Sequence, residues 1–114
     1  MSMEIIMQSK LTIAIYKPKS DRDDEMLEVL KSHTPLLKEL GLISNKPAYL
    51  ARSSNGHIIE IFEWLNEEAK VIAHSHPLLQ PVWSKMMEIC EFPSFSELPE
   101  SASSFPNFET INID

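Results

Sequence analysis

Three ionisable side chains in this sequence could carry out acid–base chemistry without a cofactor. Glu60 lies in the middle of a predicted strand, between Ile58 and Phe62, where a covered sheet face would desolvate its carboxylate and suit it to proton transfer. His33 lies on the apolar stripe of the first predicted helix, and His74 lies near the end of the next helical segment. We therefore predict that Glu60, His33 and His74 line one cavity as catalytic residues.

Structural roles would also explain these residues. Glu60 would then lie in a dimer interface and pair with Arg52, with Lys17 or with a lysine of a second copy. Each histidine would be a core or boundary residue whose hydrogen bond is satisfied.

Aromatic side chains near these residues would provide apolar walls for such a cavity. The predicted pocket-lining residues are Tyr49, Phe62, Trp64 and Trp83. The alternative is that all four simply belong to the hydrophobic core.

Several other kinds of site are absent from the sequence. Its two glycines cannot build a glycine-rich phosphate loop, and it contains neither Gly-x-Ser-x-Gly nor His-Glu-x-x-His. His74 and His76 would point away from each other on a helix, although a turn over residues 75–77 would weaken this objection. Cys90 is the only cysteine, which excludes an internal disulfide and a multi-cysteine zinc site. We predict no metal and no cofactor.

Charge and hydropathy limit the partners and the location. The formal net charge is −7, and no run of Lys or Arg is longer than two residues, which argues against nucleic acid and anionic membranes. No stretch approaches 18 consecutive apolar residues, and the first residues lack the features of a secretion signal. We expect a cytoplasmic protein.

Periodicity and turn signals predict four strands and two helical regions. The first helix is expected over residues 20–40 with a kink at Pro35, and the second begins at Asn66 and is re-aimed by Pro77 and Pro81. The predicted strands are 11–16, 47–54, 57–64 and 107–113.

The two central strands are joined by Asn55-Gly56, the preferred pair for a type I′ hairpin turn. With that two-residue turn, Tyr49 lies opposite Phe62 and shares a sheet face with Glu60. Residues outside these elements are predicted to form a loose leader (1–9) and an irregular segment before the last strand (92–106).

The order β-α-β-β-α-β is that of a ferredoxin-like split β-α-β fold, here a single α+β domain spanning residues 1–114. Such a fold has a four-stranded antiparallel sheet with its helices on one face. Because the central hairpin is apolar on both faces, we expect a second copy to cover the other face in a homodimer.

Several short motifs support a family resemblance. They are Gly41-Leu42, Asn55-Gly56, Glu60-Ile61-Phe62-Glu63-Trp64, Ala73-His74, Pro77, Trp83 and Phe105-Pro106-Asn107-Phe108. On these residues the chain resembles small proteins of the dimeric α/β-barrel superfamily, related to antibiotic-biosynthesis-type monooxygenase domains. The resemblance implies a cavity between the sheet and its helices. Activities in that superfamily include cofactor-independent oxygenation, haem degradation, isomerisation and decarboxylation, but the Asn/Trp/His set of the haem-degrading members has no match here.

These observations lead to one functional hypothesis and one alternative. The hypothesis is a cofactor-independent, monooxygenase-like enzyme that acts on a small apolar or aromatic molecule. The alternative is a non-catalytic domain that binds a small ligand or a partner. An open cavity on the helix-facing side of the sheet would favour the first.

Overall fold

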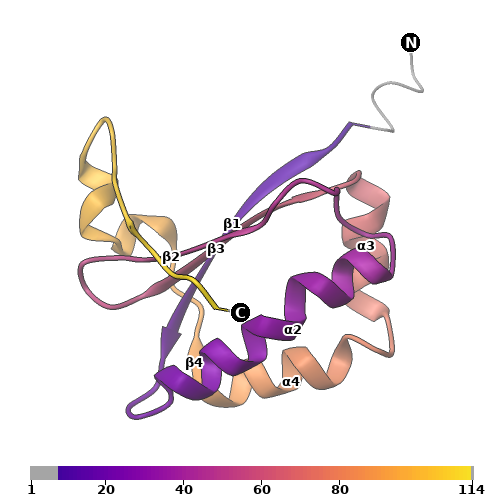
Figure 1. Cartoon of the computed structure of the whole chain (residues 1–114), viewed down its shortest axis with the longest axis horizontal. Helices are drawn as coiled ribbons and strands as arrows, with labels where there is room; N and C mark the ends of the chain where they lie inside the picture. The colour runs from indigo at the N-terminus through magenta and orange to yellow at the C-terminus, as the bar shows by residue number, and fades with distance from the viewer. Residues whose placement is uncertain (1–7, 114) are drawn as a thin grey trace.

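The structure, a computed structural model, describes residues 8–113 of the chain, so most of the predicted leader lies outside it. Within this range a five-stranded antiparallel sheet packs against three α-helices in an α+β fold (Figure 1). The strands are β1 (Lys10–Pro18), β2 (Tyr49–Arg52), β3 (Ile58–Trp64), β4 (Cys90–Glu91) and β5 (Glu109–Thr110). The helices are α2 (Asp23–Glu39), α3 (Glu67–Ser75) and α4 (Gln80–Ile89), and two 3₁₀ turns follow, η1 (Phe95–Glu97) and η2 (Pro99–Ala102).

The strand order is β4-β1-β3-β2-β5, so the prediction of four strands is wrong by one. The predicted last strand shrinks to two paired residues and lies beside β2. Ile111 N still donates to Leu50 O at 2.8 Å, and the side chains of Ile111 and Ile113 pack on the helix-facing core. The additional edge strand, β4, begins at Cys90, directly after α4 ends at Ile89.

The hairpin between β2 and β3 has a longer turn than predicted. Ser53 N donates to His57 O at 2.9 Å, and Gly56 N donates to Ser53 O at 2.9 Å. Asn55 keeps a negative φ while Gly56 has φ +91°, which makes this a type I turn followed by a left-handed glycine. The loop therefore contains three residues, and the register shifts by one.

That shift exchanges the two faces of β2, because side chains alternate along a strand. Tyr49 pairs with Ile61 rather than with Phe62, and therefore lies on the sheet face away from Glu60. Leu50 pairs with Glu60 instead. The predicted position of Tyr49 in the pocket is thus wrong.

Local sequence signals explain the helices. Acidic residues fill the first turn of α2, where the positive end of the helix dipole favours them. α2 continues through Pro35 and buries Met26, Leu30, His33 and Leu37 along one stripe. Asn66 caps α3, and its side-chain oxygen accepts a hydrogen bond from Ala69 N at 2.8 Å.

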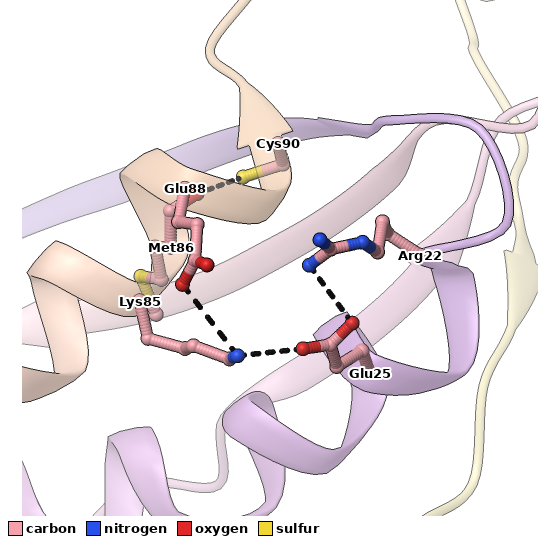
Figure 2. A network of polar contacts seen from close by, with 6 residues as sticks. All are labelled: Arg22, Glu25, Lys85, Met86, Glu88 and Cys90. Atoms are coloured by element: carbon pink, nitrogen blue, oxygen red, sulfur yellow. Dashed lines mark hydrogen bonds and ion pairs between the residues drawn. The ribbon is translucent and has the colours of Figure 1, made fainter.

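An exposed ion-pair network joins the first and last helices. Lys85 Nζ on α4 lies 2.6 Å from Glu25 Oε2 on α2, and Glu25 Oε1 lies 3.0 Å from Arg22 (Figure 2). The contact connects α4 to α2 at the surface of the helical layer.

The hydrophobic core lies on both faces of the sheet. Two clusters fill the space between the sheet and the helices. On the other face, Leu98 and Phe108 of the chain's own C-terminal segment pack on Ile15 and Ile59. This segment therefore provides part of the cover that had been expected from a second copy. In residues 8–113 no helix is long and apolar enough to cross a membrane.

Candidate functional site

A hydrogen-bonded group of three side chains is buried between the sheet and α2. Tyr16 Oη donates to Glu60 Oε1 at 2.8 Å. His33 Nδ1 lies 2.9 Å from Oε1 and 3.1 Å from Oε2 of the same carboxylate. The exposed fractions are 1% for Glu60, 4% for His33 and 4% for Tyr16. We call this group the buried triad.

The strand and helix periods of β1, β3 and α2 explain why these three side chains meet. Glu60 on β3 pairs with Ala14 on β1, and Tyr16 pairs with Ile58, so Glu60 and Tyr16 are diagonal neighbours on one sheet face. His33 belongs to the buried stripe of α2, which packs on that same face. The helix-facing positions of two strands and one helix therefore converge on the Glu60 carboxylate.

Electrostatics define the role of the tyrosine. Burial raises the pKa of Tyr16 well above its ordinary value, and the neighbouring Glu60 carboxylate and the hydrogen bond to it raise this pKa further. The hydroxyl therefore stays protonated and donates to Glu60. Oε1 accepts from both Tyr16 and His33, which fixes the carboxylate in one orientation.

The same geometry orients the imidazole of His33. With Nδ1–H donating to the carboxylate, a neutral ring carries its lone pair on Nε2. Every fully buried side-chain nitrogen or oxygen in residues 8–113 has a partner, but Nε2 forms no hydrogen bond within that range. Nε2 is thus in contact with accessible space.

That space is a pocket of about 220 Å³ between the sheet and the helices, which we call the His33 pocket. Two members of the triad, Tyr16 and His33, line this pocket together with a second histidine and three other aromatic side chains. These residues are Tyr16, His33, His74, Phe62, Trp64 and Trp83.

The structure brings some of the predicted site residues together and separates others. Glu60 contacts His33 directly but does not line the His33 pocket, whereas Phe62, Trp64 and Trp83 do line it. His74 lies at the pocket, beside Trp83 with 5.3 Å between ring centroids, but forms no hydrogen bond to Glu60.

The alternative partners of Glu60 are engaged elsewhere. Arg52 forms a two-pronged pair with Asp23, and Lys17 pairs with Glu91. Among residues 8–113, the carboxyl group of Glu60 is therefore hydrogen-bonded only to Tyr16 and His33.

Tyr16 is the member of the buried triad that sequence reasoning missed. It had been assigned only as part of the first strand. The sequence did show a hydroxyl-bearing residue at the end of an apolar run. Tyr16 lies two positions after Ala14, which pairs with Glu60. Only the pairing of β1 with β3 shows that this hydroxyl reaches a carboxylate.

No group of three His, Cys, Asp or Glu side chains in the described range is placed to hold a metal ion. His76 instead accepts a hydrogen bond from Leu78 N in the turn after α3.

The chain matches no family model, no curated protein and no solved structure. The functional argument therefore depends on the residues of the site itself.

Proposed function

We propose that this protein binds a small, largely apolar or aromatic molecule in the His33 pocket and removes a proton from it with Nε2 of His33. The observation that carries this proposal is the bond from Nδ1 to the buried Glu60 carboxylate. A carboxylate at Nδ1 holds a histidine in the tautomer that accepts protons at Nε2, and it stabilises the imidazolium that forms.

The other walls of the pocket support this chemistry. Phe62, Trp64 and Trp83 offer apolar and aromatic contacts for a ring. Lys70 also lines the pocket, and its ammonium group would favour negative charge that develops on the substrate after proton loss. The volume is below the roughly 300–1,000 Å³ of typical ligand sites, which limits the ligand to a small molecule.

The resemblance to antibiotic-biosynthesis-type monooxygenase domains suggests how the reaction would continue. A substrate carbanion left by proton removal would form a C–O bond with O₂, and the resulting hydroperoxide would lose water as a carbonyl forms. In balance, a CH₂ group and O₂ give a C=O group and H₂O. The substrate is oxidised, O₂ is reduced, and no other cofactor is needed.

A second candidate function is non-catalytic ligand binding. It is favoured by the deep burial of the triad, in which the Tyr16 hydroxyl, His33 Nδ1 and the Glu60 carboxylate bond to one another as structural groups in a core do. In that case His33 would only hydrogen-bond the ligand.

The proposal also includes a ferredoxin-like fold, a homodimer and a cytoplasmic location. The order β4-β1-β3-β2 of four of the strands supports a ferredoxin-like plan to which β5 is an addition. A homodimer and a cytoplasmic location remain expectations of the sequence.

Two measurements test the proposal on the full-length protein. Binding is tested by the thermal shift that anthrone and 1,4-naphthohydroquinone produce, with Trp83→Ala expected to reduce it. Proton removal is tested under nitrogen by the rate at which the CH₂ group of anthrone exchanges with D₂O, followed by proton NMR. We expect acceleration by the protein and a loss of about 10²–10⁴-fold of that acceleration in His33→Gln.

The outcomes separate the two candidate functions. A thermal shift without accelerated exchange would establish binding alone. If there is neither a shift nor acceleration, the pocket does not serve these ligands and the proposal fails. Tyr49→Phe is the matched control, because Tyr49 is exposed on the other sheet face and its substitution should change neither binding nor exchange.

A further inference from the structure

The outer edge of β1 is open over most of its length. β4 pairs only with Lys17 and Pro18, near the end of the strand (Figure 1). Residues 10–16 pair with β3 on the inner side, and among residues 8–113 no strand pairs with their outer side. A free edge of this kind is a template for another strand.

The register identifies which backbone groups this edge presents. The bond from Ser53 N to His57 O shows that the odd-numbered residues of β3 bond toward β2, so its even-numbered residues bond toward β1. On β1 the even-numbered residues therefore bond to β3. The N–H and C=O groups that point outward belong to Leu11, Ile13 and Ile15.

The edge residues themselves carry neither of two common devices against strand addition, a charged side chain or a proline. Residues 11–16 contain no charge and no proline, and Leu11 and Ile13 are 68% and 46% exposed. A groove of about 480 Å³ follows the edge, because four consecutive residues of β1 (13–16) line it although their side chains alternate between faces. Met87 and the segment 92–95 that follows β4 form its opposite wall, and Met87 and Phe92 are both largely exposed.

We propose that this edge pairs with β1 of a second copy, antiparallel, across a two-fold axis at Ile13. Leu11 would then lie opposite Ile15 of the partner subunit, and all six outward groups of each copy would be satisfied by six hydrogen bonds between the copies. Apolar residues meet apolar residues at 11, 13 and 15, Thr12 meets the partner subunit's Ala14, and no charged residue faces a like charge. This symmetry of the edge is the argument for a second copy over an unrelated peptide.

Such pairing would also affect the candidate site. The groove shares Ala14, Tyr16, His74 and Trp83 with the His33 pocket. A strand docked along the edge would therefore close one side of that pocket and reduce its access to water. This last consequence rests on the proposed function, whereas the dimer itself does not.

The decisive experiment is sedimentation velocity over a range of concentrations, with two matched variants. We expect the wild type to reach twice the mass of the chain. Ile13→Lys places two lysines opposite each other at the axis and should weaken the dimer by roughly 100-fold or more. Tyr49→Lys alters an exposed side chain on the same sheet face as Ile13, away from the edge, and should leave the dimer intact.

Amide hydrogen exchange provides the second measurement. In the wild type the amides of Leu11, Ile13 and Ile15 should be protected, and in Ile13→Lys they should exchange at least about tenfold faster while Thr12 and Ala14 stay protected. A wild type that is monomeric at every concentration, or a dimer that is lost with Tyr49→Lys and kept with Ile13→Lys, would overturn the proposal. Exchange at Thr12 and Ala14 shows directly whether the variant is folded.

Discussion

Nδ1 of His33 lies 2.9 Å from Oε1 of Glu60, and this contact leaves Nε2 as the ring nitrogen that faces the pocket. The relationship crosses from helix to sheet and joins residues 27 positions apart. It fixes the orientation of the His33 ring within the core.

The first prediction concerns the tautomer of this ring. At neutral pH, a neutral His33 should carry its proton on Nδ1, because the carboxylate accepts from that atom. Long-range proton–nitrogen NMR correlations distinguish the two tautomers. A proton on Nε2 would contradict the role proposed for this atom, and His76, which accepts at Nδ1 from a backbone N–H, should show the opposite tautomer as an internal reference.

Removing the Tyr16 hydroxyl should destabilise the protein. Tyr16→Phe deletes one of the two donors to Oε1 and leaves a buried carboxylate partly unsatisfied, which costs about 1–3 kcal/mol of unfolding free energy. Urea denaturation measures this loss. Tyr49→Phe, the exposed counterpart, should change it by no more than about 0.5 kcal/mol, and equal effects of the two substitutions would refute a special role for Tyr16.

The contact of Glu100 with the hairpin should respond to acid. Hydrogen bonds from Ser53 Oγ and Ser54 N lower the pKa of Glu100 from 4.5 to about 2. Because the folded pKa is depressed, the contact stabilises the fold fully above about pH 4.5 and loses that contribution as the pH falls toward 2.

This response can be followed by limited digestion with pepsin and by NMR titration of the Glu100 carboxyl carbon. Cleavage within residues 92–106 should increase between pH 4.5 and 2, and in Glu100→Gln it should be raised already at pH 4.5. Glu97→Gln, on the neighbouring turn, is the control. Cleavage that does not depend on Glu100 would show that apolar contacts alone hold this segment.

The only cysteine should be unreactive in the folded protein. Burial raises the pKa of Cys90 to about 11, and its thiol donates to Met86 O at 3.1 Å (Figure 2). Since the thiolate is the reactive form, a thiol reagent such as dithionitrobenzoate should react slowly at pH 8 and fully after unfolding in urea. Rapid reaction without denaturant would mean that the end of α4 opens readily.

Local sequence signals were sufficient for most helices and strands. The apolar stripe over residues 26–37 and the cap at Asn66 predicted two helices that the structure contains, since these signals act within a few residues. The extended segment after Asn55-Gly56 predicted β3 in the same way.

Contacts between distant segments could not be read from local pattern. Asn55-Gly56 suits more than one turn type, and the choice of a three-residue loop depends on how β2 pairs along its whole length. That choice reversed the face of Tyr49. The edge position of β4 and the cover supplied by Leu98 depend likewise on segments far apart in the chain.

The sequence by itself placed His33 on the apolar stripe of a helix and Glu60 on one face of a strand, because the helical and strand periods assign each residue to a face. Only the tertiary structure decided that Tyr16 completes the triad and that His74 stands apart at the pocket. Periodicity sets the direction in which a side chain points, whereas the distance between two side chains depends on where one element packs across another. For this protein that packing places His33 in hydrogen-bond contact with Glu60 and leaves its other nitrogen facing the pocket.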